Sequence, residues 1–345
     1  MKKLNRALSL STAAALALSL TACSGGTSGT ADTPTANASA STGGSGGTYT
    51  VAVIKQMDHA SLDEIADAIA ARLDEIAAEN GVTIQYEVTS GQGDQTVLRQ
   101  LADQAIADGV DAIIPIATTA AQVAAVSAEE SQTPVVFAAI SYPETADLTG
   151  IDYVTGTSDA LDTNLILDMM LAQNPELQSV GLLYSLSEPN SEVPIADAKA
   201  YLDEKGIAYT EATANTNDEV IAAASSLIAD GVDAVFTPTD NIIMAAELAI
   251  YEDFINAGIP HYTGADSFVR NGAFATCGVN YTDLGAQTAD LAYRAMTEGM
   301  DSLEDYYQVA GGLITVNSET AEALGIDYSV FDSMGEVAAV TTTEE

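Results

Sequence analysis

Several residue types are missing or scarce in this sequence, and each shortage excludes a class of function. Tryptophan is absent, and 50 acidic residues stand against only 10 basic ones, which gives a net charge of −40. This charge repels the phosphate backbone of nucleic acids, so we exclude a nucleic-acid-binding protein. It also leaves no basic patch for anionic lipid headgroups. Strong acidity at a low density of charged residues is typical of a protein that stays soluble outside the cell.

Histidine and cysteine are also scarce, which limits the available chemistry. The two cysteines, Cys23 near the N-terminus and Cys277 far along the chain, do not support a disulfide framework. His59, His261 and a thiol on separate predicted strands make a poor metal site, and we expect Cys277 to be a buried core thiol. The chain has no Gly-x-Ser-x-Gly and no Walker loop, and GQGD at 91–94 is too short for a dinucleotide fingerprint. We therefore predict no catalysis, no metal and no cofactor.

The N-terminal segment has the three parts of a secretory signal. A positive stretch is followed by an apolar run too short for a transmembrane helix, and the run ends in LTAC, which resembles a bacterial lipobox. We expect residues 1–22 to be a lipoprotein signal peptide and Cys23 to be the lipidation site. The alternative is an ordinary secretory signal with a chance cysteine. Residues 23–48 are rich in Ser, Gly, Thr and Ala, as in a flexible tether.

The rest of the chain alternates strands with helices of ten to twenty residues, which predicts βαβ units and parallel sheets. Its 345 residues fit two domains. We expect strands at 48–55, 82–88, 112–116, 135–140, 180–184, 207–212, 234–237 and 261–264. We expect helices at 61–80, 96–107, 119–131, 193–205, 218–229, 242–257 and 284–298.

One junction occurs twice, because the stretch IADGVDA stands at 106–112 and again at 228–234. Its Asp-Gly ends a helix and its Val and Ala begin a strand. The offset of 122 residues is the length of one domain and too long for a solenoid repeat. In open parallel sheets, ligands bind beyond the carboxyl ends of the strands. Both copies place hydroxyl-bearing residues there, at the start of a helix whose free N–H groups favour a carboxylate.

Several segments, taken in order, resemble one known family. They are VAVIKQMDHASLDE, GQGDQTVLRQLADQAIADGVDAIIPIATTAAQ, PVVFAAISYP, VGLLYSLSEPNS, DAVFTPTDNII and NYTDLGAQTADLA. They are similar to the solute-binding lipoproteins of ABC transporters, whose better-known members take tryptophan or tyrosine and have the type I periplasmic-binding-protein fold. No single motif is diagnostic; their order and spacing carry the resemblance, over residues 49–325.

The resemblance implies an α/β fold of two Rossmann-like lobes with parallel sheets, joined by three crossings of the chain that act as a hinge. Lobe one would comprise residues 49–157 and 282–311, and lobe two 158–281 and 312–330. Residues 331–345 would form an acidic C-terminal tail.

The candidate ligand contacts follow predicted strands, and each has a plainer structural reading. Asp240, between Thr239 and Asn241, is expected to accept the ligand's ammonium, or else only to cap its helix. Thr118 and Thr119 with their helix N-terminus would hold the carboxylate, or else act as plain caps. The remaining candidates are Gln56, His59, Ser141, Tyr142, Asn190, Ser191 and Asp266.

Some of these candidates have specific roles or alternatives. His59 would stack on an aromatic ring, although it could also be a surface residue before a helix. Ser141 and Tyr142 could simply form a turn set by Pro143. Asn190 and Ser191 are similar to a ligand-facing pair of the family. Because Trp is absent, an aromatic clamp must come from Tyr or Phe.

We therefore expect a monomeric, lipid-anchored protein on the extracytoplasmic face of the cell membrane. It would capture a small ligand, an aromatic amino acid, between two closing lobes and deliver it to the transmembrane subunits of an ABC permease. The same fold could instead bind a sugar, a nucleoside or a signalling molecule, as a transporter component or as a sensor. The absence of Trp argues against a sugar, because sugar sites often stack on Trp.

Overall fold

The computed structural model describes residues 46–343 and contains two sheets of mostly parallel strands. The first sheet has the strand order β11-β5-β4-β3-β1-β2. Its strands are β1 (Thr48–Lys55), β2 (Thr83–Ser90), β3 (Ala112–Ile116), β4 (Val135–Phe137), β5 (Val154–Ser158) and β11 (Tyr307–Gln308). The central strands β3, β4 and β5 are buried along their whole length, as expected of a parallel sheet covered on both faces.

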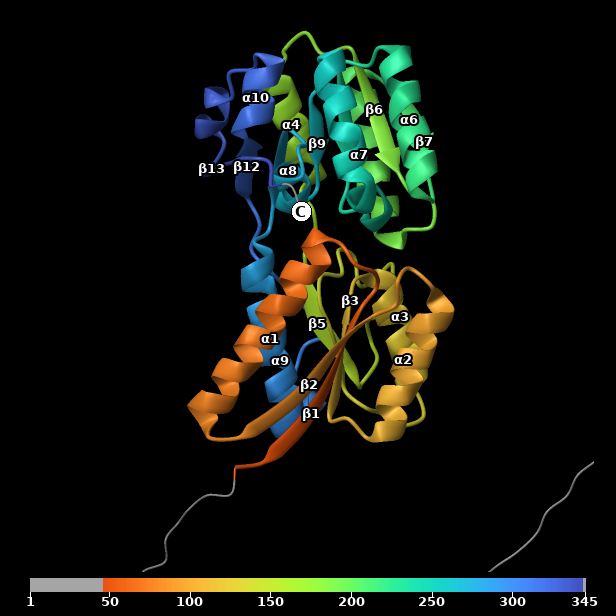
Figure 1. Cartoon of the computed structure of the whole chain (residues 1–345), viewed down its shortest axis with the longest axis vertical. Coiled ribbons are helices and arrows are strands. Elements are labelled where there is room, and N and C mark those ends of the chain that lie inside the picture. The colour runs from red at the N-terminus through yellow and green to blue at the C-terminus, as the bar shows by residue number, and fades with distance from the viewer. Residues whose placement is uncertain (1–45, 344–345) are drawn as a thin grey trace, which may run out of the picture. The chain divides into compact units, whose positions relative to one another are not determined.

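Two pairs of helices flank the first sheet, one pair on each face (Figure 1). One pair is α1 (Ala60–Asn80) and α9 (Tyr281–Glu298), and the other is α2 (Gln95–Asp108) and α3 (Thr118–Ala128). The helices α1 and α9 approach closely at Gly285, where an added Cβ would lie 2.7 Å from both the Ala68 Cβ and the Ile65 carbonyl oxygen. Glycine is therefore required there by packing. We call this sheet with its four helices the first half.

The second sheet has the order β13-β12-β10-β9-β8-β6-β7, with β12 antiparallel to β10. Its strands are β6 (Ser179–Tyr184), β7 (Ala208–Thr213), β8 (Ala234–Thr237), β9 (His261–Thr263), β10 (Ala275–Gly278), β12 (Leu313–Asn317) and β13 (Val337–Val340). Its helices are α4 (Thr163–Gln173), α5 (Glu192–Lys205), α6 (Asn217–Asp230), α7 (Asn241–Ala257), α8 (Asp266–Arg270) and α10 (Ser318–Leu324), with the 3₁₀ turns η1 (Pro189–Ser191) and η3 (Ser329–Ser333). We call these elements the second half. A further turn, η2 (Met300–Ser302), follows α9.

The repeated IADGVDA stretch forms the same junction in both halves, as predicted. Gly109 ends α2 with φ 74°, and Gly231 ends α6 with φ 70°. Both values lie in the left-handed region that favours glycine. A buried strand follows each junction, β3 in the first half and β8 in the second. The chain beyond each strand turns directly into a helix, α3 or α7.

Three segments connect the halves. The chain leaves β5 at Ser158 for α4, passes from β10 to α9 at residues 279–280, and passes from β11 to β12 at residues 309–312. The last two crossings lie close to the boundaries expected from the sequence, and the first lies just after its expected position at residue 157.

Two expectations are corrected by the structure. Residues 331–343 are not a tail, because Phe331 is fully buried and β13 pairs with β12 in parallel register. The predicted strand at 135–140 ends at Phe137, because Ala139 turns the backbone to φ 57°. The expected signal peptide and Cys23 lie outside the described residues. Within residues 46–343, no helix has both the length and the apolar character needed to cross a bilayer.

Candidate ligand-binding site

A narrow cavity lies beyond the carboxyl ends of strands from both halves, where parallel sheets bind ligands. Its volume is only about 20 Å³, little more than a single water molecule needs. The lining residues are His59, Ser61, Leu62, Ile65, Ala117, Thr118, Ala139, Ser141, Asp159, Asn190, Thr239, Asp240, Asn241, Met244, Ala265, Phe268 and Tyr281. A ligand larger than a water molecule can therefore enter only if the two halves first move apart.

Direct polar contacts join the two halves around this cavity. The Gln56 Nε2 donates to Glu188 Oε1 at 2.7 Å, and the His59 Nε2 lies 3.0 Å from Asn241 Oδ1. Further pairs are Ser141 with Thr239, Ser61 with Ser267, and Glu64 with Arg270. These contacts stabilise the arrangement in which the halves are together.

Asp240 lies at the cavity, but its carboxylate is already occupied by the protein. Its Oδ1 accepts the backbone N–H groups of Ile242 and Ile243 at 3.1 Å, and so caps α7. Its Oδ2 accepts the Ser185 N–H and the Ser191 hydroxyl, both at 2.7 Å. Burial raises the pKa of Asp240 while these hydrogen bonds act in the opposite direction. Four donors on one carboxylate leave little room for an ammonium group.

Asp159 is a second buried carboxylate in the cavity, and the sequence reasoning missed it. It lies in the first crossing, just after β5, and its exposed fraction is 4%. The Ser141 hydroxyl donates to its Oδ1 at 2.8 Å and the Tyr281 hydroxyl to its Oδ2 at 3.1 Å. Burial raises its pKa, and among the described residues it has no basic partner. A buried carboxylate with spare acceptor capacity is suited to a cationic group.

A chain of side-chain amides runs from α3 to α7 through Glu188. The Gln56 Oε1 accepts the Thr119 N–H at 3.0 Å, while its Nε2 donates to Glu188. The Asn241 Nδ2 donates to Glu188 Oε2 at 2.6 Å. Burial, reinforced by the charge of Asp240, raises the pKa of Glu188 to about 8. Both Glu188 oxygens accept hydrogen bonds in this arrangement.

His59 contributes one nitrogen to this chain and leaves the other without a partner. Its Nδ1 is buried and has no hydrogen-bond partner among the described residues. Burial lowers the pKa of His59 to about 4, so the ring is neutral near pH 7. Another cavity atom, the Oδ1 of Asn190, is also buried without a partner in the described part of the chain, while the Asn190 Nδ2 donates to the Thr239 carbonyl.

The N-terminus of α3 reaches the cavity, and its N-cap residue provides no side-chain cap, although the Thr119 N–H of its first turn is bonded to the Gln56 Oε1. Its N-cap residue, Ala117, has φ 76° and ψ 161°, and Ala139 after the neighbouring strand has φ 57°. Such conformations are rare for non-glycine residues and concentrate at functional sites. The backbone N–H groups of the first helical turn favour a negatively charged group.

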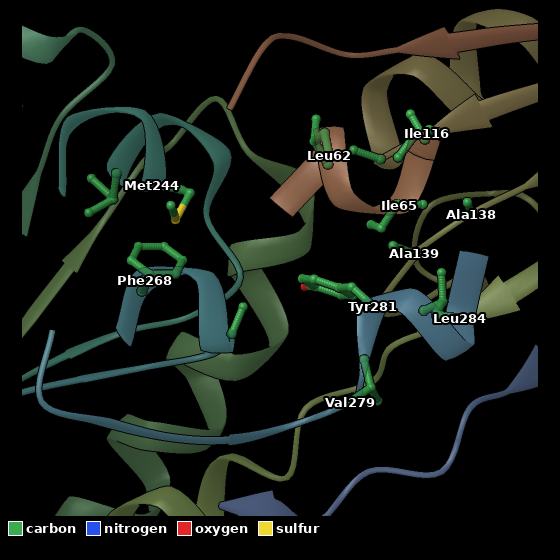
Figure 2. Close-up of a cluster of buried hydrophobic side chains, with 14 of the residues drawn as sticks. Leu62, Ile65, Ile116, Ala138, Ala139, Met244, Phe268, Val279, Tyr281 and Leu284 are labelled. Atoms are coloured by element: carbon green, nitrogen blue, oxygen red, sulfur yellow. The ribbon is translucent and has the colours of Figure 1, made fainter. Parts of the chain in front are cut away.

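The remaining walls are apolar and aromatic. Figure 2 shows Leu62 and Ile65 of α1 near Tyr281 of α9, and Met244 of α7 beside Phe268 of α8. Both are buried, since the exposed fraction is 1% for Phe268 and 4% for Tyr281. Neither aromatic residue was predicted. Phe268 follows the predicted Asp266 by two residues, on a short helix that the sequence pattern does not reveal.

The structure brings most of the sequence-predicted residues to the cavity. Seven line it, namely His59, Thr118, Ser141, Asn190, Thr239, Asp240 and Asn241. Three others do not line the cavity but take part in the hydrogen bonds described above, namely Gln56, Thr119 and Ser191. Tyr142 and Asp266 do not line it. The Tyr142 hydroxyl donates to the Leu161 carbonyl, and Asp266 pairs with Arg270 at 2.6 Å.

The comparison with known proteins gives the family. Residues 50–336 match the family described as ABC transporter substrate binding protein. The chain belongs to this family. It is a family of transporter components rather than of enzymes. The match includes strands of both sheets and ends just before β13.

Three relatives illustrate the likeness of this substrate-binding protein. A tyrosine-binding protein of Clostridioides difficile (strain R20291) is 27% identical over 251 residues, which are 71% of this chain and 72% of the relative. An ABC domain from Streptococcus pneumonia in complex with L-Trp is 27% identical, with a TM-score of 0.75 over 84% of this chain and all of the other. The ligand-free, open structure of a substrate-binding protein with adhesive properties from Clostridium difficile is 25% identical, with a TM-score of 0.64 over 86% of this chain and all of the other. The TM-score is thus higher for the L-Trp complex than for the ligand-free, open structure.

Proposed function

We propose that this chain is the extracytoplasmic, lipid-anchored binding protein of an ABC importer and that its ligand is an aromatic amino acid. The observation that carries the proposal is a single cavity that combines a buried carboxylate, an uncapped helix N-terminus and apolar walls. These features complement the ammonium, the carboxylate and the side chain of such a ligand. Relatives that bind tyrosine and tryptophan support this choice.

Each part of the ligand has a proposed contact. Asp159 takes the ammonium, a role that the sequence reasoning gave to Asp240, because Asp240 is occupied by four protein donors. The N-terminus of α3, with Thr118, takes the carboxylate. Phe268 and Tyr281 contact the aromatic ring, since offset or edge-on aromatic contacts are favourable.

Capture proceeds by closure of the two halves around the ligand. The halves separate at the three crossings, the ligand binds, and contacts from both sides stabilise the closed form. Pairs such as Gln56–Glu188 and Ser141–Thr239 then add direct stabilisation. The closed protein, a monomer held at the membrane by a lipid on Cys23, delivers the ligand to the permease.

The test is a titration of the purified protein with each of the twenty amino acids and with several sugars, followed by the melting temperature. A ligand that binds the folded state raises the melting temperature by mass action. Tryptophan binding can also be followed by indole emission, because the protein has no Trp of its own. Stabilisation by Trp, Tyr or Phe alone is the expected result, and stabilisation by a sugar alone would contradict it.

The contact roles are tested with Asp159→Asn. Removing a buried charge partner costs about 2–5 kcal/mol of binding free energy, so the affinity should fall by about 30-fold or more. Asp301→Asn, a change at an exposed aspartate outside the cavity, is the control and should bind normally. If both variants bound the ligand with equal affinity, Asp159 would not be a ligand contact.

A further inference from the structure

The hydrogen-bond chain behind the cavity fixes which ring nitrogen of His59 carries the proton. This series of hydrogen bonds begins at Gln56, whose Oε1 accepts the Thr119 backbone N–H. A backbone N–H can only donate, so this contact fixes the orientation of the Gln56 amide. Its Nε2 therefore faces Glu188, to which it donates at 2.7 Å.

When Glu188 is ionised, both of its oxygens only accept, and the next link then fixes the orientation of Asn241. Its Nδ2 donates to the second oxygen of Glu188 at 2.6 Å, so its Oδ1 faces the His59 Nε2 at 3.0 Å. An amide oxygen can only accept, and the Nε2 of His59 must therefore carry the hydrogen. A neutral ring has one N–H, which leaves the Nδ1 with a bare lone pair.

That bare nitrogen belongs to a cavity residue and is unsatisfied. The His59 Nδ1 is buried and lacks a partner among the described residues, and His59 lines the cavity. A buried acceptor without a donor is unfavourable, and a ligand donor would recover this free energy on binding.

We propose that His59 is held as the Nε2–H tautomer by Asn241 and Glu188, and that its Nδ1 accepts a hydrogen bond from an N–H or O–H group of the ligand. The proposal rests on the proposed function and adds to it a specificity contact. The donor is either the ammonium group, which all amino acids share, or a side-chain donor, which Trp and Tyr have and Phe lacks. His59 thus recognises a hydrogen-bond donor of the ligand and does not only stack on the aromatic ring of the ligand.

The decisive variant is Glu188→Gln. It reverses the direction of the hydrogen bonds from residue 188 to His59 and leaves the residues that line the cavity unchanged. The oxygen of the new side-chain amide would accept from Gln56, and its nitrogen would donate to the Oδ1 of a rotated Asn241. Asn241 would then donate to the His59 Nε2, which must lose its hydrogen. The proton moves to Nδ1, which now presents a donor to the ligand. Glu192→Gln, at an exposed glutamate on the next helix, is the matched control.

The tautomer can be measured without any ligand, by NMR of the protein with ¹⁵N-labelled histidine. The chain has only two histidines, so the spectrum contains two rings, and His59→Gln assigns the signals. The spectra are recorded above the pKa of Glu188, where its carboxylate is ionised. We expect the Nε2–H form of His59 in the wild type and in Glu192→Gln, and the Nδ1–H form in Glu188→Gln. An Nδ1–H form in the wild type overturns the proposal, whatever the ligand is.

Calorimetric titration with Trp, Tyr, Phe and 1-methyltryptophan, also performed above the pKa of Glu188, tests the contact and identifies the donor. Glu188→Gln should weaken binding about tenfold or more wherever the ligand donor meets Nδ1. A loss for Trp and Tyr that spares Phe and 1-methyltryptophan assigns the donor to the side chain. An equal loss for all four assigns it to the ammonium group.

Wild-type affinities in Glu188→Gln, with the tautomer inverted, would overturn the ligand contact. If the wild type binds none of the four, the proposed function fails, while the NMR experiment still decides the tautomer. The two failures are therefore distinguishable.

Discussion

The two copies of the IADGVDA junction lead to helices whose N-termini differ in one respect. In the second half, Asp240 caps α7 and occupies its first N–H groups. In the first half, the corresponding helix α3 begins at Thr118, and its N-cap residue Ala117 makes no side-chain cap. Both N-termini reach the same cavity. The N-terminus of α7 is therefore occupied by a carboxylate of the protein, whereas α3 has no carboxylate at its N-terminus and only its Thr119 N–H is bonded to a side chain, the amide of Gln56. A repeated junction can thus supply both a structural support and a binding group.

The strongest test of this difference is Asp240→Ala. The substitution leaves four donors unsatisfied, three of them at buried residues, namely Ser185, Ser191 and Ile243. Each buried donor that is left without an acceptor costs about 1–3 kcal/mol. We therefore expect the free energy of unfolding to fall by more than about 3 kcal/mol. Chemical denaturation measures this loss. Asp94→Ala, which removes the exposed cap of α2, should cost only about 1 kcal/mol. Similar losses in both variants would mean that Asp240 is no more than an ordinary cap.

Asp159→Asn should affect the free energy of unfolding differently from Asp240→Ala, although each substitution removes a buried carboxylate. Burial raises the pKa of Asp159 in the folded protein, so its ionisation lowers stability as the pH rises above the unfolded value. Asn cannot ionise, and we expect the free energy of unfolding at pH 7 to stay the same or rise, even though ligand affinity falls. Denaturation curves of the ligand-free variant give the answer. A loss as large as that of Asp240→Ala would assign Asp159 a structural role instead.

The contact of His59 with Asn241, at the capped helix, predicts a loss of stability in acid. The folded pKa of about 4 lies below the unfolded value of 6.5, so the folded state binds fewer protons between these values. Stability contributed by the neutral ring is present above pH 6.5 and is lost as the pH falls toward 4. His59→Gln should therefore lose about 2 kcal/mol less than the wild type between pH 7 and about pH 4.5. Parallel pH dependences of the two proteins would contradict this expectation.

The smallest expected effect concerns the backbone at the uncapped helix. Ala117 has a conformation that glycine adopts without strain, so Ala117→Gly should raise the free energy of unfolding by up to about 1 kcal/mol. Ala138→Gly is the control, because Ala138 is buried but has no positive φ, and it should be destabilising. If both variants lose stability equally in thermal denaturation, Ala117 stores no strain.

The sequence allows the fold to be predicted further than the site. The strand β8 at residues 234–237 has the predicted bounds, because apolar periodicity and the glycine stop of α6 are local signals. Asp240 is recognisable as a residue beyond a strand, but its role depends on Ser185 and Ser191, about 50 residues away in the chain. Spacing along the sequence contains no information on such partners.

The residues that were missed have non-local causes. Asp159 lies in a crossing rather than after a predicted strand, and its hydrogen-bond partner Tyr281 is 122 residues away in the chain. The apolar periodicity of β12 and β13 was not recognised, so the last residues were expected to form a tail. The positive φ of Ala117 and Ala139 is imposed by tertiary structure, and no local residue preference predicts it.

The guanidinium of Arg270 lies between carboxylates of the two halves, since it contacts both Glu64 and Asp266. It is one of only 10 basic residues in a chain of net charge −40. Closing the protein therefore brings together bodies of like charge, with Arg270 acting as a counter-ion between them. Dissolved salt weakens the attraction at Arg270, but it weakens the much larger mutual repulsion as well. The closed form of this acidic protein should accordingly become more populated as ionic strength rises.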